Sequence, residues 1–383
     1  MTDAHAEATD PQPDLRTELD HRREACPVEH DGADTWTLLR HADVVAAALD
    51  ARTFSSAAGS HRAIPNSLDG AEHAAYRAVV DRYLTEAAVA EQEAQCRAHA
   101  AAIVDALPRG SRVDAIADLG TPYAVRTQAT WLGWPPEIED QLVAWMSDNH
   151  AATRSGDRAR TAEVAARFDA LVGAQVRARR EAGAGAPDDV TTRLLLEELD
   201  GRPLTDDEVV SILRNWTAGD LGSLAASLGV IVHRLATHPE RQDVTRERVA
   251  NGEHAAIEAA IEEVLRIDDP FVANRRRTTR QVEVAGQVIP AGHRVVLSWT
   301  SANRDPRVFG DPDEFRPEEN APHNLVFGVG PHVCPGRALT LMELRVAVGE
   351  LLSRTEQLLP ADETPVREKP PVSGWARVPV VLA

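Results

Sequence analysis

The 383-residue sequence has few aromatic residues, few cysteines and no long apolar runs. Aromatic side chains make up 4% of it, and there are three cysteines. Three widely separated cysteines are too few for a disulfide scaffold or a zinc cage. No stretch approaches about twenty apolar residues, so we expect no membrane span. The N-terminus is polar and acidic, without the basic start and apolar run of a signal peptide, and we expect a cytoplasmic protein.

The sequence also has fewer basic than acidic residues. The chain has 41 Lys and Arg residues against 60 Asp and Glu residues, which gives a formal net charge of -19. Such a chain repels phosphate backbones, and no basic run reverses this, so nucleic-acid binding is not expected. What the sequence has in quantity is hydrophobic residues, 43% of the total, with Ala, Leu and Val abundant. Ala, Leu and Arg lose little conformational freedom in helices, and the composition therefore favours a helical core.

The pattern along the chain predicts helices first and a small β region late. We interpret residues 1–25 as a flexible arm and residues 26–383 as one mainly helical α+β domain. Thr205 with Glu208 three residues later is a capping box, which predicts the start of a long helix ending near Ala236. A further helix is expected over about 255–267, and another from Pro335 to about Leu352. Short strands are expected at 35–39, 281–284, 288–289 and 294–298.

The segment from His323 to Arg337 is the most informative part of the sequence. Three glycines at 328, 330 and 336 surround Cys334 with backbone that can turn tightly and approach a flat cofactor. The helix expected after Pro335 directs its amide groups and positive dipole end at the sulfur, which favours a thiolate. A thiolate is the ligand that a haem iron needs for splitting an O–O bond. The segment therefore predicts a haem-thiolate site.

This segment resembles the haem-binding signature of the cytochrome P-450 superfamily. The resemblance extends from about Pro27 to the C-terminus, and it implies a single helix-rich domain with small β-sheets. In such a domain haem b lies between a long distal helix and the proximal helix that follows the cysteine loop, with Cys334 as the axial ligand. The signature fixes six residue types within ten positions, namely Phe327, Gly328, Gly330, His332, Cys334 and Gly336.

Further motifs match the family in the expected order. Glu263 and Arg266 lie three residues apart, on one helical face, and resemble the family's Glu-x-x-Arg pair. Asn303 and the Phe315-Arg316 pair resemble the meander that partners it, and we interpret these five residues as structural. The resemblance also implies contacts to the haem propionates, from His73, Arg77, Arg276 and His332.

The long helix departs from the family pattern on the distal face. Ala218 and Gly219 match the small pair that leaves room for dioxygen, but Leu221 and Gly222 stand where members have an acid and then a Thr. Asp220 and Ser223 flank these positions, and a π-bulge would rotate one of them inward. Alternatively Asp220 faces solvent or caps a neighbour, Ser223 bonds its own helix, and ordered water or a substrate hydroxyl delivers protons.

Family position also suggests apolar walls for a substrate pocket, although simple core packing explains the same residues equally well. These residues are Ile64, Trp145, Phe271 and Val272. No flavin or nicotinamide motif is present, so a separate ferredoxin or flavodoxin with its reductase is expected to pass electrons from NAD(P)H. Four arginines are candidates for a basic docking face, or else are scattered surface residues: Arg77, Arg82, Arg337 and Arg345.

The resemblance therefore predicts a monooxygenase that hydroxylates or O-dealkylates a small organic or natural-product substrate. Because the distal acid and alcohol are missing, a second hypothesis is a reaction driven by peroxide or an oxidative coupling reaction. A third reading, from another class, is a non-catalytic haem sensor or binding protein.

Overall fold

The structure is a computed structural model that describes residues 14–59, 62–369 and 373–383. Most of the expected flexible arm, residues 1–13, lies outside these ranges. For residues 15–25 the expectation is wrong, because they form helix α1 (Leu15–Ala25). Arg23 of this helix is buried and donates a 2.7 Å hydrogen bond to the carbonyl of Ser301. The helix is thus tied to the body of the protein.

The fold is a single, mainly helical domain, as predicted. The long helix α9 starts at the expected capping box, in which Thr205 and Glu208 bond each other's backbone. After α1, the helices in the described residues are α2 (His41–Leu49), α3 (Gly70–Val80), α4 (Glu86–Ala106), α5 (Thr121–Leu132), α6 (Glu139–Ser155), α7 (Arg158–Ala182), α8 (Val190–Leu195), α9 (Asp206–Thr237), α10 (Pro239–Asn251), α11 (His254–Ile267), α12 (Trp299–Ala302), α13 (Pro306–Phe309), α14 (Pro317–Asn320) and α15 (Arg337–Ser353). Shorter helical turns are η1 (Asp81–Leu84), the π-helical η2 (Ala115–Gly120), η3 (Pro136–Ile138), η4 (Gly183–Gly185), η5 (Ala321–His323) and η6 (Gly330–His332).

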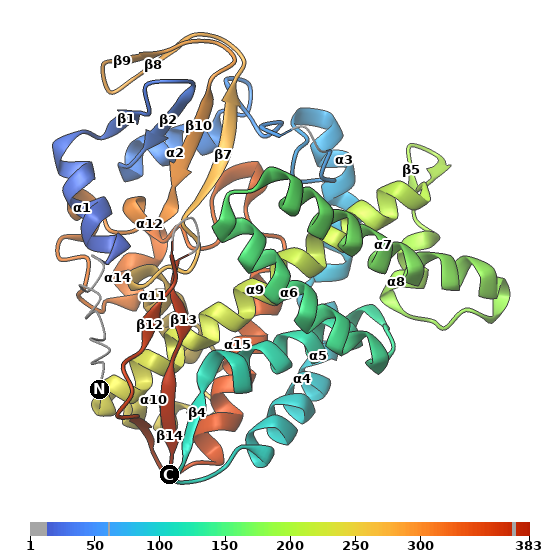
Figure 1. The fold of residues 1–383 in the computed structure, drawn as a ribbon, viewed down its shortest axis with the longest axis vertical. Helices are drawn as coiled ribbons and strands as arrows, with labels where there is room; N and C mark the ends of the chain where they lie inside the picture. Colours follow the sequence, from blue (N-terminus) through green and yellow to red (C-terminus); the bar gives the residue numbers. More distant parts are fainter. Residues whose placement is uncertain (1–13, 60–61, 370–372) are drawn as a thin grey trace, which may run out of the picture.

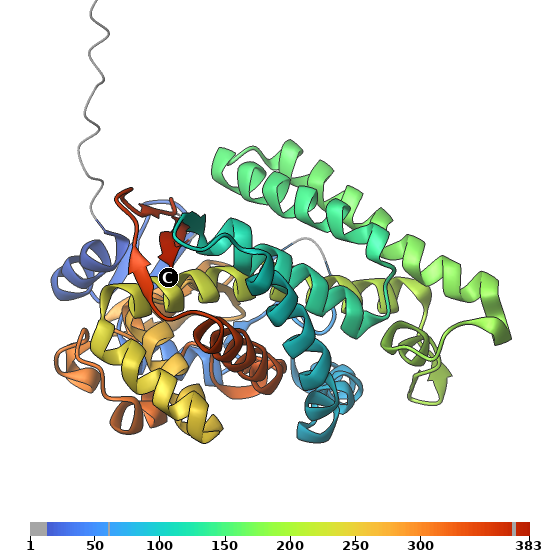
Figure 2. The same cartoon turned by 90° about the horizontal axis from the view of Figure 1, so that it is seen from below.

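Helix α9 runs through the middle of the helical part of the molecule (Figure 1). It packs against α5, α7, α11 and α15, and α15 packs in turn against α4. Figure 2 shows α6 and α7 as an antiparallel pair on one face of the molecule. The apolar residues of α9 that face these neighbours, such as Leu221, Leu224 and Leu228, are fully buried. This burial makes α9 the axis about which the site is built.

The β region forms one five-stranded sheet and smaller pieces beside the helices (Figure 1). In the larger sheet the order is β1-β2-β10-β7-β3, and β2 and β10 are the parallel pair. Strands at the predicted places are confirmed, whereas β7 was not predicted because its sequence is polar. The strand bounds are β1 (Val28–His30), β2 (Thr35–Leu38), β3 (Phe54–Ser55), β4 (Arg112–Asp114), β5 (Glu198–Leu199), β6 (Arg202–Pro203), β7 (Ala273–Thr278), β8 (Val282–Val284), β9 (Gln287–Ile289), β10 (Arg294–Ser298), β11 (Leu358–Pro360), β12 (Val366–Arg367), β13 (Trp375–Arg377) and β14 (Pro379–Leu382).

Candidate functional site

The loop that carries Cys334 is held in a tight turn just before α15. The Cys334 N–H donates a 2.8 Å hydrogen bond to the carbonyl of Phe327. Gly328 and Gly330 have φ values of +72° and +79°, a region that favours glycine. A Cβ built on Gly330 would lie 2.9 Å from the side chain of Leu49 and 3.3 Å from the carbonyl of Ala48. The loop therefore needs glycine at 330 for its conformation and for its close approach to α2.

Burial of the Cys334 sulfur and the positive groups near it shift the pKa of its thiol in opposite directions. Burial and the charge of Asp220 raise the pKa of the Cys334 thiol, while the N–H of Gly336 and the charges of Arg77 and Arg337 lower it. A thiol gives up its proton when it binds a metal ion. The amide and the two guanidinium groups then stabilise the thiolate that results, while burial keeps water from competing for the metal.

Glu263 and Arg266 of α11 form the buried pair that their spacing predicted. Arg266 donates from Nε and Nη2 to the two Glu263 carboxylate oxygens, both at 2.8 Å, and both side chains are essentially unexposed. Glu263 Oε1 also accepts hydrogen bonds from the N–H of Arg316 at 2.9 Å and from Asn320 at 2.7 Å. The Phe315 ring lies under the guanidinium of Arg241, at 3.8 Å. Because each charge has a partner, the pair clamps the meander to α11.

Asn303 links this clamp to the cysteine loop. The carbonyl of Asn303 accepts a 2.9 Å hydrogen bond from Arg266, and its side-chain oxygen accepts one of 2.7 Å from the N–H of Leu325. Its side-chain amide donates to Asp269 at 3.1 Å. Leu325 lies two residues before Phe327, so the ion pair on α11 positions the loop through a short chain of buried hydrogen bonds.

The residues predicted to bind propionates lie in one cluster beside the loop. His73 of α3 and His332 lie with their ring centroids 4.1 Å apart. Arg77 donates to the carbonyls of Pro331 and Val333, at 3.2 and 2.9 Å, and pairs with Asp81. His332 contacts the hydroxyl of Ser56 at 2.9 Å. Segments that are far apart in the chain thus bring these cationic groups together.

Arg276 of β7 is the member of this cluster that points to an anionic ligand. It is 6% exposed, and its guanidinium donates to the carbonyl of Arg275 at 2.9 Å. Within the described residues no ion pair is found for it. Burial and the neighbouring His73 and Arg276 together lower the pKa of His332 to about 4, although Asp69 acts to raise it. A buried cation without a carboxylate partner is costly, so this cluster fits the carboxylate groups of a haem.

On α9, the face that holds Ala218 and Gly219 is open. Both residues are exposed although Trp216, Thr217 and Leu221 are buried, and a Cβ built on Gly219 would meet no atom within 4 Å. The helix is α-helical over its whole length, so the π-bulge considered from the sequence is not found. An open strip beside two small residues fits a flat group lying against α9.

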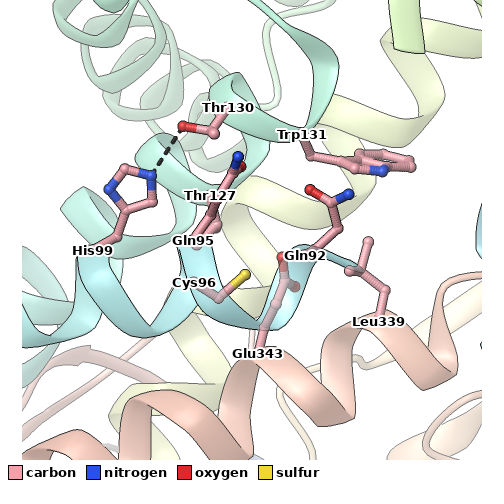
Figure 3. A pocket seen from close by; sticks show the side chains of 9 residues that line it. All are labelled: Gln92, Gln95, Cys96, His99, Thr127, Thr130, Trp131, Leu339 and Glu343. Carbon is pink, nitrogen blue, oxygen red and sulfur yellow. Dashed lines mark hydrogen bonds between the residues drawn. The ribbon is translucent and has the colours of Figure 1, made fainter. Parts of the chain in front are cut away.

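Asp220 belongs to the opposite side of α9, since two residues correspond to about 200° of helical rotation relative to Gly222. Its Oδ2 is buried and has no hydrogen-bond partner among the described residues. Burial raises its pKa to about 7, and its charge in turn raises the pKa of Glu343, a buried residue of α15. Figure 3 shows Glu343 beside Cys96 of α4, in a small cavity where α4, α5 and α15 meet. The same charge raises the pKa of the Cys334 thiol, so Asp220 acts on the interior between α9 and α15, which includes the cysteine.

Ser223 bonds back to its own helix, through a 3.1 Å hydrogen bond from its hydroxyl to the carbonyl of Asp220. The group that approaches Gly222 comes from another helix. A Cβ on Gly222 would lie 3.6 Å from Nε2 of His150, on α6. Sequence reasoning missed this histidine, because no local motif surrounds it.

The proposed pocket residues lie in different surroundings. Ile64 is buried, its N–H donates to Ser211 and its carbonyl accepts from Asn215, so it lies against α9. Trp145 stacks on Phe168 of α7, with ring centroids 3.8 Å apart. Phe271 and Val272 are half-buried just before β7. The role of these four residues in a pocket stays a prediction.

The four arginines considered as a basic docking face all have carboxylate partners. Arg337 pairs with Glu262 at 2.8 Å, and Arg82 pairs with Glu197 at 2.9 Å. Arg345 is buried between Glu93 and Glu258. With Arg77 paired to Asp81, these residues give little free positive charge. Within the described ranges, no helix is long and apolar enough to cross a membrane.

Comparison with known proteins finds relatives that match most of the chain. The Cytochrome P450 family model matches residues 150–380. Erythromycin C-12 hydroxylase of Saccharopolyspora erythraea is 33% identical over 354 residues, 88% of this chain and 86% of that protein. Cyclomarin C epoxidase CymV of Salinispora arenicola is 31% identical, over 84% of each. The structure of a mutant of P450 EryK in complex with erythromycin B has a TM-score of 0.86 at 31% identity, over 96% of both chains.

The cysteine loop, the buried clamp behind it and these similarities all lead to one assignment. The chain belongs to the cytochrome P450 family and is a haem-dependent monooxygenase.

Proposed function

We propose that this monooxygenase oxidises a small organic molecule of the natural-product type, by hydroxylation or O-dealkylation. Three observations support the proposal: the tight Cys334 loop before α15, the open strip of α9 at Ala218 and Gly219, and the buried Arg276 beside His332. The similar proteins support the substrate class, since their names describe oxidations of erythromycin and cyclomarin C.

Each group in the site has a defined task in this proposal. Haem b, when bound, supplies the activation of dioxygen, and the thiolate of Cys334 donates charge to its iron. Arg276, His73 and His332 bind the propionates, and Arg77 holds the carbonyls of the loop. Ala218 and Gly219 leave room against α9 for dioxygen and substrate. The Glu263–Arg266 clamp keeps the loop in place during the reaction.

Electrons come, in this proposal, from a separate ferredoxin or flavodoxin and its reductase, supplied by NAD(P)H in the cytoplasm. A peroxide-driven reaction is the second candidate, favoured by Gly222, which carries no alcohol on the distal face. To separate the two, turnover is measured with ferredoxin, reductase and NADPH, and then with hydrogen peroxide alone. Turnover with peroxide only would replace the first proposal by the second, and haem binding without turnover in either system would favour a sensor.

The haem-thiolate assignment is tested by the difference spectrum of the reduced protein with carbon monoxide. We expect the red-shifted Soret band of a thiolate-ligated haem, and its loss in Cys334→Ala. Cys96→Ala is the matched control, because Cys96 is the buried cysteine of α4 and lies in the cavity of Figure 3. A band that survives Cys334→Ala, or disappears in Cys96→Ala, would contradict the assignment.

A further inference from the structure

His150 of α6 is the side chain that approaches the open face of α9 at Gly222. A Cβ on Gly222 would lie 3.6 Å from its Nε2, an ordinary van der Waals contact. Ala218 and Gly222 are four residues apart, so they lie on one face of α9, with Gly219 beside them. The imidazole therefore lies at the edge of the strip where dioxygen and substrate are expected.

The open face of α9 has no free acid or alcohol of its own. Asp220 lies about 200° around the helix from Gly222, and its charge acts on Glu343 and on the thiol of Cys334. The hydroxyl of Ser223 donates to the carbonyl of Asp220, and positions 221 and 222 are Leu and Gly. A proton donor for this face must therefore come from water, from the substrate or from a neighbouring element.

His150 has the properties that such a donor needs. Its imidazole makes no hydrogen bond within residues 14–59, 62–369 and 373–383, so its polar atoms remain available to water or ligand. Burial lowers its pKa; the charge of Glu368 raises it and that of Arg154 lowers it. Arg154 and Glu368 are themselves paired at 3.0 Å, partly exposed, at the end of α6. The imidazole at the edge of the strip thus lies near charged groups that reach the surface.

We propose that His150 delivers protons to the distal face of the haem site. The proposal rests on the monooxygenase function proposed above, in which one oxygen atom of dioxygen leaves as water and the electrons come from the ferredoxin. In each proton transfer an N–H bond of the protonated imidazole would break and an O–H bond would form on the oxygen atom that leaves as water, which returns the ring to its neutral form. The imidazole then regains a proton from solvent on the side of Arg154 and Glu368. Imidazole is the most common general acid in enzymes because its pKa lies near neutrality.

The C–O stretching frequency of the reduced carbon monoxide complex tests the proposal, because a nearby hydrogen-bond donor lowers it. We expect the band to shift to lower frequency as the pH falls below the usual range for histidine and the imidazole gains its second N–H. His150→Phe removes the donor, and the pH dependence should disappear. His150→Gln keeps an N–H donor that does not titrate, so its band should be shifted but independent of pH.

The matched control is His233→Gln, which changes a histidine of α9 whose ring lies tilted against Trp375, with ring centroids 4.2 Å apart. It should leave the C–O band and its pH dependence as in the wild type. A second measurement is the oxidation of guaiacol by hydrogen peroxide, which should fall at least about tenfold in His150→Phe and stay unchanged in His233→Gln.

Two results would overturn the proposal: a C–O band that depends on pH equally in wild type and His150→Phe, or guaiacol oxidation at the wild-type rate in His150→Phe. Failure of the function itself gives a different result. In that case the wild-type protein shows no red-shifted Soret band, or shows it without turnover in any system. The band also reports folding, since a variant that retains it has assembled its haem site.

Discussion

Asp220 is a half-buried acid whose Oδ2 is buried and has no hydrogen-bond partner among the described residues. Burial raises its pKa from 3.8 to about 7, so folding favours its protonated form. The same residue raises the pKa of Glu343 on α15. At neutral pH it is therefore unfavourable for Asp220 and Glu343 to be ionised at the same time. Helix α9 therefore carries a cost in stability that depends on pH.

Replacing Asp220 by Asn should stabilise the protein at pH 8 by roughly 2–4 kcal/mol, from the shift of about three pKa units. Asn has the shape of the protonated acid but never ionises. The penalty on the wild type is absent well below its unfolded pKa and complete above about pH 7. The gain should therefore shrink as the pH falls towards 4.

Urea unfolding of both proteins between pH 4 and pH 8 measures this difference. The control is Asp118→Asn. The carboxylate of Asp118 has a hydrogen-bond partner, because it accepts from the N–H of Asp114, so this change should not stabilise the protein at pH 8. A difference between wild type and Asp220→Asn that is the same at every pH would contradict the prediction.

At the scale of the element, helix α11 holds neighbouring segments in place through its buried Glu263–Arg266 ion pair. Glu263 holds three partners at once, namely Arg266, the N–H of Arg316 and the amide of Asn320. Arg266 also reaches the carbonyls of Asn303, Pro312 and Glu314. This helix therefore fixes the meander, and through Asn303 it fixes the cysteine loop.

We expect Glu263→Ala to destabilise the protein by about 3–5 kcal/mol, because it leaves the Arg266 charge buried and unpaired. Its neighbour Glu262 makes a partly exposed pair with Arg337, and Glu262→Ala should cost about 0–1 kcal/mol. Thermal or urea unfolding of the two variants measures both values. Equal losses in the two variants would show that the buried pair has no special part in the fold.

At the scale of the whole molecule, the candidate haem site brings together residues from elements that lie far apart in the chain. His73 comes from α3, Arg276 from the five-stranded sheet, and Cys334 from the loop before α15. These elements bring the buried Arg276, which has no ion pair among the described residues, beside His332, while Asp69 acts on both. The haem propionates are thus expected to contribute to the stability of the fold.

Arg276→Leu should change stability in opposite directions in the two forms of the protein. In the haem-free chain it removes a buried cation without a carboxylate partner, so the free energy of unfolding should rise, by about 1–3 kcal/mol. In the loaded protein it removes a propionate contact, so haem should be lost more readily and the unfolding temperature should fall. Calorimetry of both forms and transfer of haem to apomyoglobin measure the two effects. A change of the same sign in both forms would contradict this role for Arg276.

Much of this architecture was predictable from local patterns. The capping box at Thr205 and Glu208, the turns around β8, β9 and β10, and the spacing of Glu263 and Arg266 depend on residues within a few positions of each other. Such patterns act through the backbone hydrogen bonds and helical faces that neighbouring residues share. The glycines around Cys334 likewise report a backbone conformation that few other residues adopt.

Tertiary structure alone decided the rest. Strand β7 was missed because its side chains are polar, and it is a strand because β10 and β3 pair with it on both sides. The direction of Asp220, the carboxylate partners of the four arginines and the approach of His150 to Gly222 involve residues far apart in the chain. Burial and charge pairing depend on which distant elements pack together, and no local spacing encodes that. The sequence by itself thus determined the family, and it predicts Cys334 as the ligand of the iron. The packing of α6, α9 and α15 decided which side chains approach the open strip of α9.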